Sequence, residues 1–314
     1  MSHLLCANRV RCIVLWPLFF FAVSVAHAKE VAPQWSVSPV LGVHAPALSL
    51  LNNEAFKSPL RITAQVMDEF GEMKSRRVSF RTPLPEIGAG AEAGLDIQWN
   101  ISESLGLFVG YGTWEGESSA QTVGEFPLEG ALDNAVNERS VRLSYNQAYL
   151  GIRYAFLQKP RKYRTYARFS LHNIFDFDYR EDQVFTFLTG GATGFKRIII
   201  TKAHATAIIL AQTGLGFDYF IKDWFSIGFE AGYVIGLSTF ELSRATREDD
   251  FLGTDGIGSV RLPLAVPNRD GVLHYLDASG PVEADGTKPD DSTYRSMSLG
   301  LDGWKAAFRI SIEY

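Results

Sequence analysis

The chain has 314 residues, a formal charge of −5 at pH 7 and a hydrophobic share of 46%. This acidic balance argues against nucleic acid as a partner, because nucleic-acid-binding domains carry basic surfaces. Both cysteines, Cys6 and Cys12, lie close to the N-terminus, which leaves the rest of the chain without a disulfide or a cysteine-based metal site. No stretch after Lys29 is apolar over the ~20 residues that a membrane-spanning helix needs.

Residues 1–28 have the features of a secretory signal peptide. Arg9 and Arg11 precede an apolar stretch that runs from residue 13 to residue 26, and Ala26-His-Ala28 has the small-x-small form of a cleavage site. The apolar stretch is too short to cross a bilayer as a helix. Cleavage after Ala28 would leave residues 29–314 as one domain with a formal charge of about −7, because two arginines and no acidic residue are removed.

Apolar and polar residues alternate in eight segments, as expected for strands with two different faces. The first segment, 34–43, contains Pro39, which lacks a hydrogen-bond donor and makes this strand the weakest of the eight. The last segment, 297–314, changes parity at Asp302-Gly303, which predicts a β-bulge. The eight predicted strands are 34–43, 86–99, 105–111, 141–156, 165–175, 205–220, 225–237 and 297–314.

The connections between these segments alternate in length. Short polar turns are predicted at 100–104, 157–164 and 221–224, and long loops at 44–85, 115–140, 177–202 and 242–295. A short helical turn is predicted within 46–56. Outer-membrane barrels have an even number of antiparallel strands, short periplasmic turns and long extracellular loops. If the hairpin-like segments 60–67 and 76–82 also crossed the membrane, the number of strands would be ten.

The C-terminal strand from Trp304 to Tyr314 alternates without interruption and ends in an aromatic residue. It resembles the closing strand of bacterial outer-membrane β-barrels. Over residues 34–314 the chain resembles small barrels of the OmpA-type and OmpW-type eight-stranded architecture, although no subfamily motif is present. The resemblance implies an all-β fold, a closed antiparallel transmembrane β-barrel in the outer membrane of a Gram-negative cell. It also implies contact with outer-membrane lipid and lipopolysaccharide, and with the barrel-assembly machinery through the C-terminal strand.

The two faces of the predicted strands differ in chemistry. A soluble β-sandwich would also have one apolar face, but here aromatic residues gather near both ends of the strands, as they do at the two interfaces of a membrane barrel. The closing strand and aromatic belt comprise Trp99, Tyr154, Phe217, Tyr219, Phe225, Trp304, Phe308 and Tyr314.

The opposite face predicts a charged lumen. Glu230 with Arg309, and Arg168 with Asp218, are predicted to form ion pairs on neighbouring strands. The inward face is also rich in glycine, which leaves room either for long Arg and Tyr side chains from across the barrel or for a small cavity. The predicted lumenal charge network comprises Glu92, Asp96, Arg153, Arg168, His172, Asp218, Glu230, Lys305 and Arg309, and Glu313 is predicted on the same inward face.

Catalytic signals are weak. Ser170, His172 and Asp176 supply the residue types of a hydrolase triad on one strand, but residues two apart on a strand are separated by roughly 6.5 Å. The acidic residues of 242–295 lack the spacing of a calcium-binding EF-hand loop. No catalytic residue, metal or cofactor is therefore expected.

These features favour a non-enzymatic barrel. Its surface loops would contact a ligand, a partner protein or lipopolysaccharide, and a narrow porin-like path for small solutes through the lumen stays open as a possibility. The alternative is an outer-membrane enzyme that modifies lipid, similar to a lipid A deacylase or acyltransferase. Conductance and the mass of lipid A would separate the two hypotheses.

Overall fold

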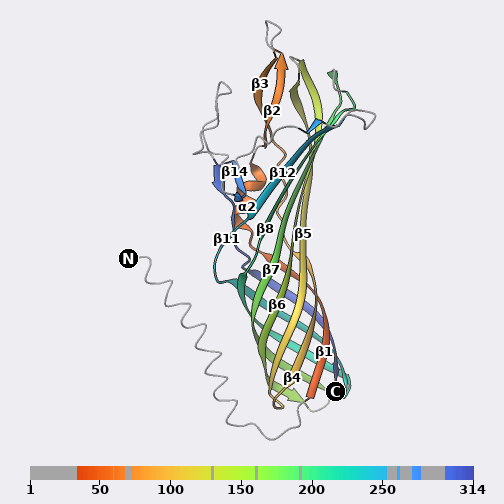
Figure 1. Ribbon diagram of the computed structural model, residues 1–314. Helices are drawn as coiled ribbons and strands as arrows, with labels where there is room; N and C mark the ends of the chain where they lie inside the picture. The colour runs from red at the N-terminus through yellow and green to blue at the C-terminus, as the bar shows by residue number, and fades with distance from the viewer. Residues whose placement is uncertain are drawn as a thin grey trace.

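A computed structural model of the chain describes residues 34–58, 60–67, 73–128, 131–159, 162–190, 193–252, 260–261, 271–276 and 294–314. The predicted signal peptide, 1–28, lies outside these residues. Strands account for most of what is described, and one sheet of eleven strands forms the body of the molecule (Figure 1). The chain is therefore all-β, as predicted.

Eight antiparallel strands of this sheet close into a hydrogen-bonded ring, with β1 between β4 and β17, and β7 between β6 and β9. The C-terminal strand closes the ring against the first strand, where the Tyr314 amide donates to the Trp35 carbonyl at 2.8 Å. The ring strands are β1 (Gln34–Pro46), β4 (Gly90–Asn100), β5 (Leu105–Leu128), β6 (Ala131–Lys159), β7 (Tyr163–Phe187), β9 (Ile208–Lys222), β10 (Phe225–Gly236) and β17 (Gly303–Glu313).

The ring contains eight strands, which confirms the prediction of eight rather than ten. The two additional strands were predicted at 60–67 and 76–82. In this region β2 (Leu60–Met67) and β3 (Met73–Phe80) form a separate two-stranded sheet. The three short turns are also confirmed, because β4 and β5, β6 and β7, and β9 and β10 are joined by a few residues each at one end of the ring. Pro39 is accommodated within β1, where it lies opposite Leu95 of β4.

Two of the predicted long loops are largely strands. β5, β6 and β7 continue far above the ring, and β8 (Lys196–Ala205), β12 (Ser243–Leu252) and β13 (Val260–Arg261) extend the same sheet. The prediction of loops at 115–140 and 177–202 is therefore wrong, and so is the first part of the loop predicted at 242–295, where β12 and β13 lie. Exposed charged residues such as Glu115, Glu117 and Arg142 obscure the strand pattern, while Val141 and Leu143 keep the apolar alternation on the other face. We call this part of the molecule the upper sheet.

Segments from the remaining long connections cover the inner face of the upper sheet (Figure 1). The helix α2 (Ser49–Asn53) and the 3-10 helix η1 (Ala55–Lys57) confirm the predicted helical turn. Leu51, Phe56, Val141, Phe177 and Met297 are among the residues of one continuous apolar core. The remaining covering strands are β11 (Phe240–Glu241), β14 (His274–Leu276), β15 (Tyr294–Ser296) and β16 (Ser298–Leu299).

The parity change near Asp302 has a different cause from the predicted bulge. Residues before it leave the ring, because β16 pairs with β11 in a separate sheet. Asp302 then marks the rim: its carboxylate accepts a hydrogen bond from the Gly236 amide at 2.8 Å, and its carbonyl accepts one from the Ala47 amide at 2.6 Å.

A true irregularity lies where the ring passes into the upper sheet. Strand β7 pairs with β9 as far as Ile174, and with β8 from Phe177 onward. Its pairing with β6 shifts at the same level, and the buried positions change from even to odd residue numbers. On the neighbouring strand, Ala207 separates β8 from β9 with a φ of 60°, in the left-handed region. A bulge and a kink therefore lie side by side at the rim.

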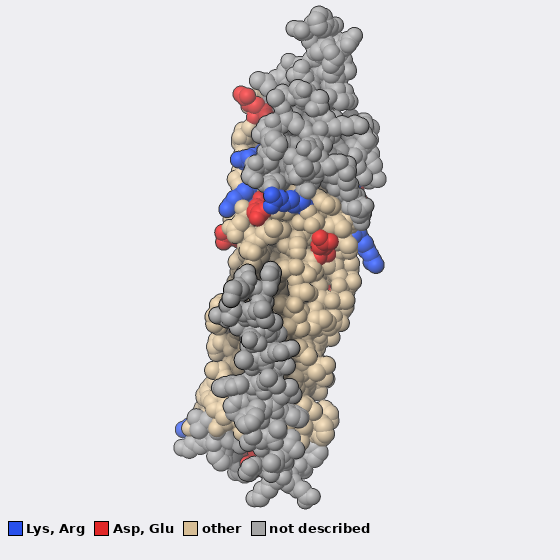
Figure 2. Space-filling view, turned by 90° about the vertical axis from the view of Figure 1, so that its left-hand side faces the viewer, with Lys and Arg blue, Asp and Glu red and all other residues tan. Residues whose placement is uncertain are grey.

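The outer face of the ring is apolar. Leu41, Val109, Leu150, Leu215 and Phe229 are each more than half exposed. Figure 2 shows a wide band of the lower body without visible charged side chains, bordered above by charged residues. An exposed apolar surface of this extent needs a partner surface or lipid to cover it.

Within the described residues, no helix combines the length and apolar character needed to cross a membrane.

Candidate functional site: the polar interior of the ring

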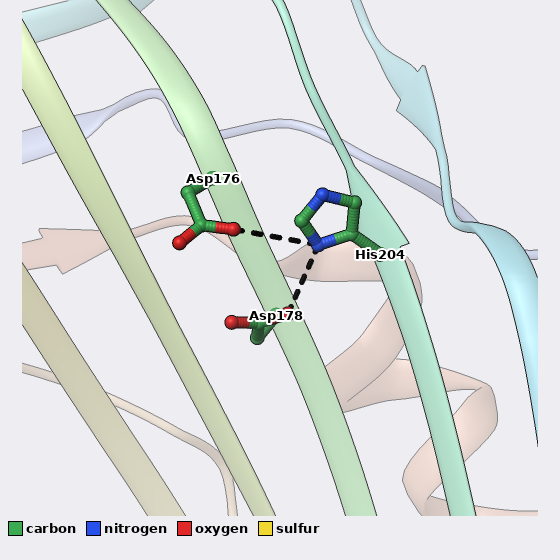
Figure 3. Close-up of side chains that lie close together, drawn as sticks. All are labelled: Asp176, Asp178 and His204. Carbon is green, nitrogen blue, oxygen red and sulfur yellow. Dashed lines mark hydrogen bonds and ion pairs between the residues drawn. The ribbon is translucent and has the colours of Figure 1, made fainter.

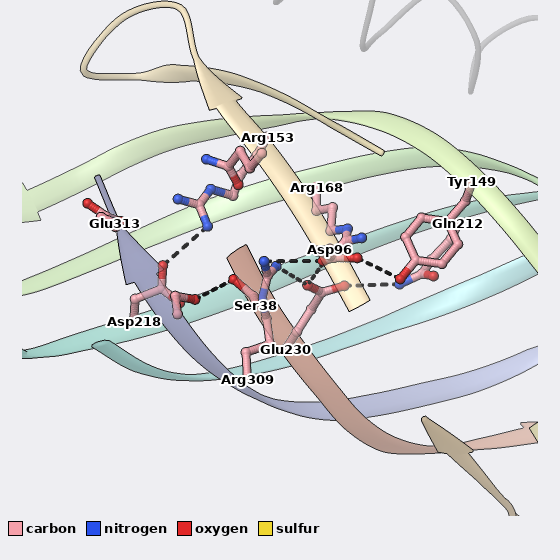
Figure 4. Close-up of polar contacts among 12 residues, drawn as sticks. Ser38, Asp96, Tyr149, Arg153, Arg168, Gln212, Asp218, Glu230, Arg309 and Glu313 are labelled. Atoms are coloured by element: carbon pink, nitrogen blue, oxygen red, sulfur yellow. Dashed lines mark hydrogen bonds and ion pairs between the residues drawn. The ribbon is translucent and has the colours of Figure 1, made fainter. Parts of the chain in front are cut away.

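A cluster of four charged residues occupies the middle of the ring interior (Figure 4). Arg168 of β7 lies 2.8 Å from Asp96 of β4 and 3.0 Å from Glu230 of β10. Arg309 of β17 contacts the same two carboxylates at 3.2 and 3.4 Å. All four side chains are buried. Each carboxylate is thus shared by two guanidinium groups, and strands on opposite sides of the ring are linked through its interior.

Further polar groups complete the middle cluster. The Tyr149 hydroxyl donates to Asp96 at 2.6 Å, and the Gln212 amide donates to Glu230 at 3.0 Å. The guanidinium of Arg168 also lies 3.8 Å from the ring centroid of Phe108, in cation–π geometry. Burying an ion pair carries a large desolvation cost unless its remaining hydrogen-bonding groups find partners. These neighbours reduce that cost.

A second cluster lies toward the end of the ring with the short turns. Asp218 of β9 contacts Arg164 at 3.0 Å and Arg153 at 3.3 Å, and Arg164 also contacts Glu313 at 2.7 Å. The predicted ion pair between Glu230 and Arg309 is present, but the predicted partner of Asp218 is wrong. Asp218 lies opposite Arg164 rather than Arg168, because β7 begins within the segment predicted as a turn.

A third cluster lies toward the rim. Lys305 contacts Glu92 at 2.5 Å, and the Gln147 amide donates to the same carboxylate at 2.9 Å. His172 Nδ1 lies 2.9 Å from Gln147 Oε1, and its Nε2 lies 2.8 Å from the Ser170 hydroxyl.

The interior is balanced in charge. Every charged residue predicted for the lumen, including Glu313, points into it, and the structure adds Arg164 to that set. Arg164 was missed because it was assigned to a turn, although it shares the even-numbered parity of Arg168. The clusters contain five acidic side chains, Glu92, Asp96, Asp218, Glu230 and Glu313, and five basic ones, Arg153, Arg164, Arg168, Lys305 and Arg309.

At two positions, inward-facing glycines make room for a large aromatic side chain and do not leave an empty space. A Cβ atom on Gly110 would lie 2.2 Å from the ring of Tyr149, and one on Gly216 would lie 2.2 Å from the ring of Tyr166. Tyr166 is fully buried and lies 4.6 Å below the guanidinium of Arg153. Aromatic rings therefore fill volume that the glycines leave.

The possible triad is only partly assembled. Ser170 and His172 are in hydrogen-bonding contact, but Asp176 does not join them. The bulge in β7 turns Asp176 to the outer face, where it accepts a hydrogen bond from Asn146 at 3.1 Å. Ser170 has no exposed surface, so a substrate could not reach it in this arrangement.

The predicted aromatic belt residues point away from the interior. Trp35 and Trp99 stack at 6.1 Å near the turn end of the ring, and Tyr233 and Trp304 meet edge to face at 5.2 Å near the rim. Trp304 and Tyr314 are among the most exposed of these residues, at 70% and 75%. The outward belt residues are Trp99, Tyr154, Phe217, Tyr219, Phe225, Trp304, Phe308 and Tyr314.

No protein-family model matches the chain, and no curated protein does. Among solved structures, the translocator domain of the autotransporter NalP from Neisseria meningitidis matches with 9% sequence identity and a TM-score of 0.19, covering 98% of this chain and 97% of that one. A Pseudomonas aeruginosa FadL homologue matches with 7% identity and a TM-score of 0.19, covering 90% and 89%. These likenesses identify no family.

Proposed function

We propose that the protein is an integral outer-membrane β-barrel with a closed lumen, and that it acts through its upper sheet outside the cell rather than as a pore. In a closed ring the backbone groups of every strand are hydrogen-bonded to a neighbouring strand. A β-sheet protein in lipid needs this, because the bilayer core offers no water to the backbone groups. The uncharged outer face, with aromatic residues at both ends, supports a membrane-embedded ring. The end with short turns and Tyr314 would face the periplasm.

The observation that carries the closed lumen is the middle cluster of Asp96, Arg168, Glu230 and Arg309. Opening a path through it would require several buried charges to lose their partners together, and each broken buried pair costs several kcal/mol. An eight-stranded barrel also has an interior that side chains alone can fill. The cluster therefore favours a structural plug over a path for solutes.

The upper sheet is the part that supports an extracellular contact role. It has an apolar core of its own, which includes Phe56, Leu143 and Phe177, and so it presents a defined surface instead of flexible loops. Arg139 fixes the covering segment to the sheet: it donates to the carbonyls of Phe56 and Thr82 at 3.0 and 2.9 Å and pairs with Glu181 at 2.7 Å. A ligand, a protein partner or lipopolysaccharide would bind this surface.

Planar-bilayer recording of the purified protein tests the closed lumen. We expect no stable conductance steps from the unaltered protein. The double variant Arg168→Ala/Arg309→Ala removes both cations of the middle cluster and should show conductance if it inserts. Steps of uniform size from the unaltered protein would overturn the closed-lumen proposal. A faster gel migration of unheated protein, with membrane fractionation, checks the barrel itself.

The contact between Ser170 and His172 favours one second candidate, a lipid-modifying enzyme. The pair lies inside the ring, separated from surrounding lipid by the wall, so this function would require acyl chains to enter the interior. Mass spectrometry of lipid A from cells with the protein, without it, and with Ser170→Ala distinguishes the two candidates. A mass shift that depends on Ser170 would overturn the non-enzymatic proposal.

A further inference from the structure

Two aspartates and a histidine meet on the outer face of the wall, just above the rim (Figure 3). His204 of β8 places its Nδ1 atom 2.9 Å from Asp178 Oδ1 and 3.6 Å from Asp176 Oδ1, both on β7. One ligand atom from each residue can be chosen so that all three lie within 4.8 Å of one another. None of these residues takes part in the lumenal network described above.

The irregularity at the rim creates this juxtaposition. Below it, even-numbered residues of β7 point into the ring, and above it they point outward. Asp176 and Asp178 therefore share the outer face with each other and not with His172. Asp178 lies directly opposite His204 in the pairing of β7 with β8. Bulges commonly re-aim side chains in this way.

We propose that Asp176, Asp178 and His204 form a binding site for a divalent transition-metal ion of the zinc class. Ligands at about 2.1 Å from a tetrahedral zinc ion lie roughly 3.4 Å apart, and the two distances from His204 Nδ1, 2.9 and 3.6 Å, bracket that separation. Three protein ligands leave at least one coordination position open. On this surface the open position faces outward, where water or an external group can occupy it.

The choice of metal follows from the donor set. Imidazole nitrogen is a preferred ligand of zinc and other transition metals, whereas calcium and magnesium prefer sites built from oxygen atoms. The site contains two carboxylates with a formal charge of −2 and one imidazole. This combination favours a transition metal and disfavours calcium.

Neighbouring side chains hold one ligand in place. Asn146 donates to Asp176 Oδ2 at 3.1 Å, which leaves Oδ1 directed at His204, and the Tyr111 hydroxyl donates to Asn146 at 3.1 Å. Such hydrogen bonds orient metal ligands from outside the coordination shell. Tyr111 and Phe175 lie together on the outer face, with ring centroids 6.2 Å apart, so the site lies at the upper border of the apolar band. A bound ion would join β7 to β8 where the wall bends.

Isothermal titration calorimetry with zinc chloride tests the proposal on the full-length mature chain in detergent, purified without a histidine tag. We expect one saturable site per chain in the unaltered protein. His204→Ala and Asp178→Asn should each weaken zinc binding by more than tenfold, and Asn146→Ala by ~10-fold. Calcium chloride and magnesium chloride should give much weaker binding.

Asp182→Asn is the matched control, because Asp182 lies on the outer face of the same strand but pairs with Arg180 at 2.8 Å. This variant should bind zinc like the unaltered protein. Heat-modifiable gel migration verifies that each variant is folded. Absence of saturable zinc binding, retention of full affinity in folded His204→Ala, or equal affinity for calcium would each overturn the proposal.

Discussion

The ring and the upper sheet are built from the same strands but are opposite in polarity. In the ring, the interior contains the charged clusters around Asp96 and Asp218, and the exterior is apolar. In the upper sheet, the interior is an apolar core around Phe177, and the exterior carries charged pairs such as Arg142 with Glu115 at 3.0 Å. Strand β7 passes through both regions, and its bulge at the rim changes which residues face inward.

This inversion shows that the inner face of one strand can be polar in one part of the molecule and apolar in another. The surroundings on the outside determine which side must be apolar, and in the proposed setting those surroundings are lipid around the ring and water around the upper sheet. The interior of the ring is therefore stabilised by ion pairs and hydrogen bonds, and the interior of the upper sheet by close packing of apolar side chains. The two regions should therefore respond differently to substitutions of the same kind.

The largest effect should come from breaking the middle cluster of the ring. Arg168→Ala leaves Asp96 and Glu230 with one guanidinium where they had two, and we expect it to destabilise folding by about 3–5 kcal/mol. Arg142→Ala, on the exposed face of the upper sheet, should cost at most ~1 kcal/mol because its pairs are solvated. Urea unfolding in lipid vesicles measures both. Equal midpoints would contradict the assignment of Arg168 to a buried network.

A substitution in the apolar core should affect the other region selectively. Phe177→Ala removes a fully buried ring from the upper sheet and should cost about 3–4 kcal/mol there. Phe175→Ala, two residues earlier on the opposite face, should cost less because that ring is 43% exposed. Limited proteolysis with intact heat-modifiable migration would show a loosened upper sheet on a folded ring. If Phe177→Ala abolished that migration, the two regions would not be separable.

The sequence predicts the ring well because the period of two is strong there. All eight ring strands, the three short turns and the closing of Tyr314 against Trp35 follow from alternation and connection length. The inward orientation of the lumenal charges follows from the same parity. These features depend on local patterns that a single sequence displays.

The sequence does not predict features that depend on relations between strands. The partner of Asp218 depends on where β7 begins. The strand starts at Tyr163 and not at residue 165, and Arg164, which was assigned to a turn, lies opposite Asp218 in place of Arg168. The bulge that turns Asp176 outward cannot be recognised in the sequence. Phe175 and Phe177, on either side of Asp176, lie on opposite faces of the strand although both are apolar and two residues apart. The same limitation concealed the group of Asp176, Asp178 and His204, whose members come from two strands and match no contiguous motif.

A smaller effect should follow from adding volume inside the ring. Gly216→Val places side-chain atoms where the Tyr166 ring lies, and overpacking of this kind costs about 1–3 kcal/mol. Adding Tyr166→Leu to Gly216→Val should recover part of the lost stability, because the smaller side chain vacates that volume. Gly88→Ala is a suitable control, since a Cβ atom there would meet no other atom within 4 Å. The unfolding midpoints in urea of the unaltered protein, the single variants Gly216→Val and Tyr166→Leu, and the double variant measure the coupling. Additive effects would mean that the two positions do not compete for space.

The smallest effect concerns the carboxylate that helps to fix the covering segment to the upper sheet. Burial raises the pKa of Glu181, but Arg139 and the hydrogen bonds from Tyr179 and Gln183 outweigh it, so the pKa lies below its ordinary value of 4.5. A depressed pKa means that the contribution to stability is present above pH 4.5 and is lost as the pH falls through the lowered value.

We therefore expect the upper sheet to become more sensitive to an acid-active protease as the pH falls through this lowered pKa. Glu181→Gln should remove this part of the pH dependence and lower the stability at neutral pH, because Arg139 would lose its ionic partner. Glu115→Gln serves as the control, since Glu115 is half exposed and pairs with solvated Arg142. An unchanged pH profile in Glu181→Gln would mean that the attachment of the covering segment rests on the carbonyl contacts of Arg139 alone.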